Sequence, residues 1–239
     1  MLARAVKQMA ESAPRPHVLV GCTGSVATVK VPQLALSISK FADVRVVATE
    51  HALHFLSEGV AGSYAPEAWA AFKASGVRVY RDADEWKDYK SVHGDPVVHI
   101  ELRKWADVVL VAPLGANTLA KLANGLCDNL LTSVCRVHDP TSPLVLAPAM
   151  NTMMWDHPIT EAQLTTLRGW GAAVVPPVVK TLACGDTGTG AMASVEDVTE
   201  AVRVKLAHLL EGADDTRALE EGGDGGSGVT AAGAGASGS

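Results

Sequence analysis

Short valine-rich runs that alternate with helical segments constrain the fold of this 239-residue chain more than any other feature. Runs of this kind become strands that are buried on both faces of a parallel sheet. The six runs are HVLVGCT, DVRVVAT, VRVY, ADVVLVAP, PLVLAPA and AAVVPPVV. Their alternation with helices predicts an α/β fold, in which one open parallel sheet carries helices on both faces.

The segments between the runs carry helix signals. Val31, Leu34, Ile38 and Phe41 follow helical spacing. A second helix is predicted from Pro158 to about Gly169. Ser194 and Asp197 resemble a capping box for a last helix. Residues 62–76 interrupt the alternation of strand and helix segments and indicate an insertion.

Composition sets the domain boundaries and excludes several classes of protein. We expect a single domain over residues 16–211, between a flexible N-terminus (1–15) and a disordered glycine-rich tail (212–239). The net charge is −6 and no basic stripe is present, which argues against nucleic-acid binding. No apolar stretch has the length of a membrane span, and the N-terminus lacks the apolar region of a secretory signal. A cytoplasmic location is therefore expected, although a short organelle presequence stays open.

Metal binding and disulfides are not predicted. The four cysteines form no CxxC pair, and neither they nor the eight histidines have the spacing of zinc ligands.

Ligands of such sheets bind beyond the carboxyl ends of the strands. In GCTGSVA, Gly21 and Gly24 would let the backbone approach a phosphate, and Ser25 would supply a hydroxyl. A tight strand-to-helix turn explains the same residues. In APLGANTLA, Asn117 and Thr118 either cap a helix or bind a planar ligand.

Five segments, taken in order, carry a family resemblance: GCTGSVA, VHIEL, APLGANTLAKLANGLCDNLL, APAMNTMMW and LACGDTGTGAMA. Over about residues 16 to 210 the chain resembles the flavin-containing cysteine decarboxylases, which include the halotolerance-type flavoproteins. The resemblance implies a flavodoxin-like, Rossmann-like doubly wound sheet in three layers, FMN as cofactor, and a homotrimer with active sites between subunits. It also implies decarboxylation of 4'-phosphopantothenoylcysteine to 4'-phosphopantetheine in coenzyme A biosynthesis, through a thioaldehyde, loss of CO2 and reduction of an enethiol.

The resemblance further implies roles for individual residues. His99 matches the base of the oxidative half, Cys184 the proton donor of the reductive half, and Asn151 the group that holds the substrate carboxylate. The other expected substrate contacts are Ala183, Met192 and Lys180. Lys180 stands one position before Thr181, where the family usually has a base. The expected FMN contacts are Gly24, Ser25, Val26, Thr49, Gly115, Ala116, Asn117, Thr118 and Ala149.

Structural interpretations compete with these roles. A histidine beside apolar residues is often a core residue, and Asn151 could simply cap a turn. The other histidines, and Cys22, Cys127 and Cys135, are interpreted as core. Met150, Met153, Met154 and Trp155 are interpreted as packing.

Three other functions compete with the decarboxylase. They are a decarboxylase of another cysteine-terminated substrate, a regulatory flavoprotein that inhibits a phosphatase, and an electron-transfer flavodoxin. The presence of His99, Asn151 and Cys184 together favours the enzyme.

Overall fold

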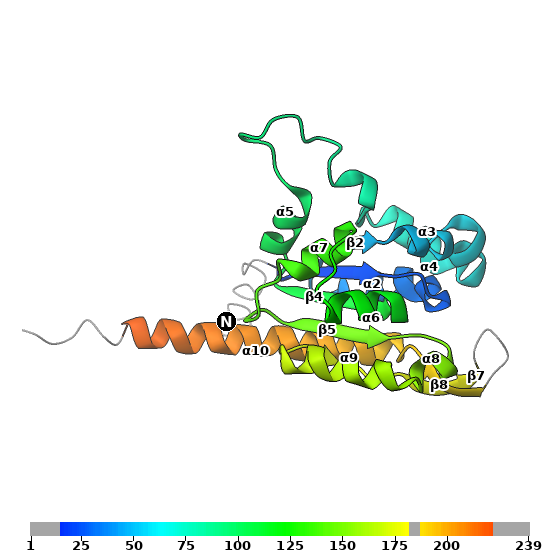
Figure 1. Cartoon of the computed structure of the whole chain (residues 1–239). Coiled ribbons are helices and arrows are strands. Elements are labelled where there is room, and N and C mark those ends of the chain that lie inside the picture. Colours follow the sequence, from blue (N-terminus) through cyan, green and yellow to red (C-terminus); the bar gives the residue numbers. More distant parts are fainter. Residues whose placement is uncertain (1–14, 182–186, 222–239) are drawn as a thin grey trace, which may run out of the picture. The chain divides into compact units, whose positions relative to one another are not determined.

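The computed structural model describes residues 15–181 and 187–221 of the chain. Its main sheet has six parallel strands in the order β3-β2-β1-β4-β5-β6 (Figure 1). The strand order reverses between β1 and β4, which pair directly with one another. A crevice at such a switch point is where open α/β sheets bind ligands. The strands are β1 (His17–Cys22), β2 (Asp43–Ala48), β3 (Arg78–Tyr80), β4 (Val108–Leu114), β5 (Leu144–Pro148) and β6 (Ala173–Val174).

The predicted fold class is confirmed, and burial explains why valine-rich runs form it. All seven residues of β4 are buried, as are the last five of β1. Side chains on both faces of these strands are therefore covered by helices. The helices and helical turns are η1 (Val26–Lys30), α2 (Val31–Ile38), α3 (Glu50–Phe55), η2 (Glu58–Gly62), α4 (Pro66–Ala74), η3 (Asp82–Asp84), α5 (Val98–Trp105), α6 (Ala116–Ala123), α7 (Leu130–Arg136), α8 (Thr152–Trp155), α9 (Pro158–Gly169) and α10 (Val195–Glu221).

The segment 62–76, expected to be an insertion, belongs to the regular alternation. It contains α4, which packs against α2 and buries Phe72. Parallel strands need a crossover connection, and α4 lies in the connection from β2 to β3. The insertion interpretation was therefore wrong.

The run AAVVPPVV does not form one strand. Its first part gives β6 at the edge of the main sheet, and its second part begins β7 (Val178–Thr181). β7 pairs antiparallel with β8 (Thr187–Ala191) in a separate two-stranded sheet. Pro176 and Pro177 lie at the break, because proline has no N–H to donate to a strand ladder.

The last helix begins where the capping signal predicts. The Asp197 N–H donates to Ser194 Oγ at 3.0 Å, and the Ser194 hydroxyl donates to the Asp197 carboxylate at 2.8 Å. One compact unit ends at Leu206, and a second begins at Ala207. Helix α10 continues to Glu221, so the expected boundary between 211 and 212 falls inside it. The helix formers of ALEE precede the glycines that begin at Gly222, which accounts for this extension.

Across the described residues, no helix combines the length and the apolar character that crossing a membrane requires.

Candidate functional site

A buried threonine joins two of the loops at the carboxyl edge of the sheet. The Thr23 hydroxyl donates to the carbonyl oxygen of Pro113 at 2.9 Å and accepts from the N–H of Gly115 at 2.8 Å. Thr23 is 2% exposed, so these bonds are shielded from water. The loop after β1 and the loop after β4 are therefore held at a fixed separation. The sequence interpretation passed over Thr23, because nothing marks it apart from its neighbours.

The two glycines of the first loop differ in what they make room for. A Cβ at Gly21 would collide with the Leu131 side chain, so this glycine serves helix packing and not ligand approach. The prediction for Gly21 was wrong because the residue lies inside β1 and its face is already covered. Gly24 is exposed, and a Cβ there would lie 2.6 Å from the Cβ of His51. Ser25 caps η1 by accepting from the Ala27 N–H at 3.4 Å.

Helix α6 begins without a side-chain cap. Gly115 is its N-cap residue and contributes no side chain, and neither Asn117 nor Thr118 caps the helix. The capping alternative for those two residues was therefore wrong. Thr118 is buried and Asn117 is exposed. Thr49 is the buried N-cap residue of α3 and also makes no side-chain cap.

These loops fit FMN. The first N–H groups of an uncapped helix bind anions and carbonyl oxygens, and Ser25 and Asn117 add a hydroxyl and an amide from neighbouring loops. Val26 is 50% exposed beside them and offers an apolar surface to a flat ring. Ala149, at the end of β5, is buried and makes a backbone bond to Leu114 at 2.9 Å. The FMN contacts expected at Gly24, Ser25, Val26, Thr49, Gly115, Ala116, Asn117, Thr118 and Ala149 remain a prediction.

Asn151 lies between the end of β5 and the start of α8. Its Oδ1 accepts from the Met153 N–H at 2.8 Å, which makes it the N-cap residue of α8. Met150 is buried and Trp155 is packed against the core, as predicted. Met153 and Met154 are 75% and 54% exposed, so the packing interpretation was wrong for them. They lie on a four-residue helix that is too short to bury both faces.

The β7–β8 hairpin is attached to the same place. The Met150 N–H donates to the Gly190 carbonyl at 2.9 Å. Gly190 has a φ of 148°, and a Cβ on it would collide with the Met150 carbonyl oxygen. A Cβ on Gly188 would lie 2.6 Å from Thr152. Only glycine permits so close an approach of β8 to the end of β5.

The expected substrate residues fall on or near this hairpin. Lys180 lies exposed on β7, and its positive charge, together with burial as the larger cause, lowers the pKa of Lys30. Met192 is only 2% exposed, so any contact with substrate would come from its backbone. Ala183 and Cys184 follow β7 in the sequence and lie outside the described residues.

His99 lies apart from these loops. It stands in the first turn of α5, which packs against α7. Figure 1 shows α5 and α8 well separated. The His99 Nδ1 lies 2.5 Å from Glu85 Oε1. Sequence reasoning missed Glu85, because an acid in the charged run RDADEWKD carries no signal of burial.

The core interpretation of the remaining cysteines and histidines is confirmed for some of them and wrong for others. Cys22 is buried and Cys135 partly buried, and burial raises the pKa of each thiol to about 12. Cys127 is exposed, so its core interpretation was wrong; it lies in the loop between α6 and α7. The core interpretation was also wrong for several histidines that are exposed on helices or in loops. These are His51, His54, His93, His157 and His208.

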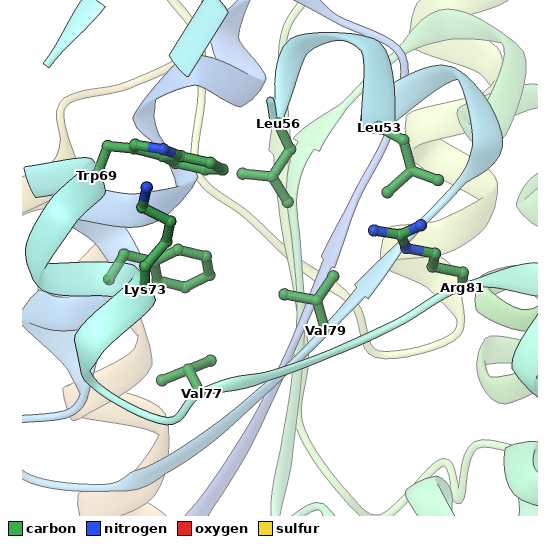
Figure 2. A pocket seen from close by; sticks show the side chains of 8 residues that line it. Leu53, Leu56, Trp69, Lys73, Val77, Val79 and Arg81 are labelled. Carbon is green, nitrogen blue, oxygen red and sulfur yellow. The ribbon is translucent and has the colours of Figure 1, made fainter. Parts of the chain in front are cut away.

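A pocket of about 200 Å³ lies elsewhere, against β3. Figure 2 shows Trp69 and Lys73 on one side of it and Leu53 and Arg81 on the other. None of the predicted site residues that the structure describes lines this pocket. Lys73 is engaged by Glu58 at 2.7 Å.

The six-stranded parallel sheet, whose strand order reverses between β1 and β4, defines an α/β protein with a Rossmann-like fold. Comparison with known proteins narrows this class. The profile of the flavoprotein family matches residues 6–207. A phosphopantothenoylcysteine decarboxylase of Mus musculus is 49% identical over 196 residues, which cover 80% of this chain and 87% of the mouse protein. This chain belongs to the flavoprotein family, and the predicted resemblance is confirmed.

Two solved structures agree with this assignment. A PPC decarboxylase mutant complexed with pantothenoylaminoethenethiol is 46% identical, with a TM-score of 0.72 over 80% of this chain and 97% of the other. The FMN-binding protein AtHal3 is 46% identical, with a TM-score of 0.69 over 80% of this chain and 96% of the other.

Proposed function

We propose that this chain is an FMN-dependent decarboxylase that converts 4'-phosphopantothenoylcysteine to 4'-phosphopantetheine in coenzyme A biosynthesis. The observation that carries the proposal is the 49% identity to the mouse decarboxylase over most of both chains. The related structure with bound pantothenoylaminoethenethiol supports the substrate class, because that ligand is a decarboxylated enethiol. We place the enzyme in the cytoplasm.

The chemistry requires an electron sink before CO2 can leave. FMN, when bound, would supply the oxidation of the cysteinyl CH2–S group and would return the same electrons at the end. The chain's own residues must then remove the thiol proton, hold the carboxylate and supply a proton to the product. We assign these tasks to His99, Asn151 and Cys184 respectively.

Asn151 suits the carboxylate because an amide donates hydrogen bonds without a charge that would oppose CO2 loss. Its Oδ1 accepts from the Met153 N–H, and this bond fixes the orientation of the amide plane. The bond joins the strand end to α8, so the amide is carried by rigid elements. The expected contacts of Ala183, Met192 and Lys180 with substrate remain part of this proposal.

Cys184 is proposed as the proton donor of the last step. Cys184→Ser should still release CO2 but should accumulate an enethiol, because a serine hydroxyl is a far weaker acid than a thiol. Mass spectrometry of the product checks this expectation. Formation of 4'-phosphopantetheine at the normal rate by this variant would remove Cys184 from the mechanism.

We also propose a homotrimer whose active sites lie between subunits. The separation of His99 on α5 from Asn151 at the start of α8 supports this arrangement, because one chain does not bring the base and the carboxylate holder together. Light scattering coupled to size exclusion would give the number of subunits.

One assay tests the reaction. The purified protein should be yellow, should release FMN on denaturation, and should form CO2 and 4'-phosphopantetheine from 4'-phosphopantothenoylcysteine. Turnover of a cysteine-terminated peptide in place of that substrate would instead indicate a peptide decarboxylase. A flavoprotein inert towards both would contradict the proposal.

A further inference from the structure

Within the described part of the chain, the His99 ring makes one hydrogen bond, with a carboxylate that is itself almost completely buried. The Nδ1–Oε1 distance is 2.5 Å, within the range of a short charge-assisted bond. Glu85 is 8% exposed, and the His99 side chain is 21% exposed. The histidine therefore reaches the surface while its partner does not.

The second oxygen of this carboxylate is not engaged by the part of the protein that the structure describes. Among the described residues, Glu85 Oε2 is buried without a hydrogen-bond partner. A buried carboxylate with so little compensation is costly, so the imidazole N–H is the main group that stabilises it. A purely structural acid would be expected to have both oxygens engaged.

Glu85 is not needed to hold its own turn. Two neighbouring acids already do so. The Asp84 carboxylate accepts from the Arg81 N–H at 2.8 Å, and the Asp82 carboxylate accepts from the Leu130 N–H at the start of α7 at 3.0 Å.

Helix α7 thus anchors both members of the pair. Through the bond from its Leu130 N–H to Asp82, it holds the turn that carries Glu85. It also packs against α5, which carries His99. The pair is positioned before any substrate arrives, which is the condition for a preorganised site.

We propose that Glu85 is the positioning residue of His99: it accepts the Nδ1–H and thereby leaves Nε2 as the atom that takes the substrate thiol proton. This proposal rests on the proposed function for the identity of the substrate. In the step itself, the S–H bond breaks, an N–H bond forms at Nε2, and the electron pair stays on sulfur. The products of the transfer are a thiolate and an imidazolium.

The carboxylate favours this transfer in two ways. It selects the tautomer whose Nε2 carries a lone pair, and it attracts the imidazolium more strongly than the neutral ring. The second effect is differential, because it stabilises the state after proton transfer more than the state before it.

The first test is spectroscopic and independent of the substrate. In protein labelled with nitrogen-15 histidine, two-bond correlation spectra distinguish the nitrogen that carries the proton, and His99→Asn assigns the signal. At mildly alkaline pH the FMN-bound protein should show His99 protonated at Nδ1 alone. Glu85→Gln should give a mixture of tautomers, because the amide can donate to Nδ1 as well as accept from it. Protonation at Nε2 in the unmodified protein overturns the proposal even if Glu85→Gln does not fold.

The second test is kinetic. Glu85→Gln should lower kcat by at least about tenfold, while KM stays within about twofold, because substrate contacts are untouched. Glu85→Asp keeps the charge and should recover part of the rate. Glu101→Gln is the matched control, because Glu101 lies on α5, is exposed and pairs with Lys104. This variant should have the kcat and KM of the unmodified protein. An unchanged kcat for Glu85→Gln overturns the proposal. If the unmodified protein shows the expected tautomer but no turnover, only the proposed function fails.

Discussion

Asn151 has a structural bond and a proposed chemical task in the same side chain. Its Oδ1 caps α8 through the Met153 N–H, and its amide is assigned to the substrate carboxylate. The capping interpretation is therefore confirmed and the carboxylate role stays a prediction, and variants that keep only one of the two properties can separate them.

Asn151→Asp retains an oxygen for the Met153 N–H but places a negative charge beside the substrate carboxylate. We expect thermal stability close to that of the unmodified protein and a fall in kcat/KM of about a hundredfold or more. Asn151→Ala should lose the cap as well, at a cost of about 1 kcal/mol. Thermal unfolding and steady-state kinetics on the two variants measure these effects. Normal kcat/KM in Asn151→Asp would rule out its carboxylate role.

Two cysteines should make the folded protein less stable at alkaline pH. Burial raises the pKa of the Cys22 and Cys135 thiols from 9.0 to about 12, so the folded state retains their protons longer than the unfolded state does. Their contribution to stability is complete below pH 9 and is lost as the pH rises towards 12. As the pH rises from about 9 to about 10, each thiol should lower the free energy of unfolding by about 1 kcal/mol.

Urea unfolding at these two pH values checks the effect. The double variant Cys22→Ala/Cys135→Ala should show a shallower loss of stability with pH, whatever its stability at neutral pH. Equal pH dependence in both proteins would contradict the expectation.

Residue types were a poor guide to burial. The sequence marked Asn151 through its motif, but Cys127 was taken as core and is exposed, and Glu85 was passed over and is buried. Whether a short charged segment turns inward depends on partners distant in sequence, here the Leu130 N–H that holds Asp82. The local sequence pattern does not indicate such a partner.

At the scale of elements, strands and their loops were largely predictable, and their attachments were not. The hydrophobic runs gave the positions of β1 to β5. The position of the β7–β8 hairpin depends on Met150 and Gly190, which bond across forty positions of sequence. The Thr23 bridge between two loops has the same long-range character.

The hairpin attachment can be tested at Gly190. A Cβ in Gly190→Ala would collide with the Met150 carbonyl oxygen, at a φ of 148° that alanine rarely adopts. We expect a loss of more than about 1 kcal/mol in stability and a marked fall in turnover, since Cys184 lies between β7 and β8 in the sequence. Thermal unfolding and the decarboxylase assay measure both.

Gly169→Ala is the matched control for this substitution. Nothing lies within 4 Å of a Cβ at Gly169, at the end of α9. It should be neutral or stabilising by up to about 1 kcal/mol. Should the two variants behave alike, close approach of β8 to β5 is not what requires glycine at position 190.

At the scale of the molecule, the sequence predicted the sheet but could not place His99. Periodicity assigns residues to elements, and the switch point gathers the loops that follow the strands. His99 follows no strand. It opens α5, so its location depends on how α5 packs against α7.

The separation of His99 from Asn151 leads to a prediction about assembly. His99→Asn and Asn151→Asp should each be inactive alone. Co-expressed with different tags and purified through both, they should form trimers with two copies of one variant and one of the other. If each site combines His99 of one subunit with Asn151 of its neighbour, one junction in three carries both intact residues, because a cyclic trimer repeats the same contact three times.

Tandem-purified mixtures should therefore recover about one third of the activity of the unmodified protein. A mixture of the two proteins combined without subunit exchange is the control and should remain inactive. Were both residues of a site supplied by one chain, every junction in the mixed trimer would lack one of them, and the tandem-purified protein would be as inactive as its parents. The measured fraction thus reports directly whether the base and the carboxylate holder come from different subunits.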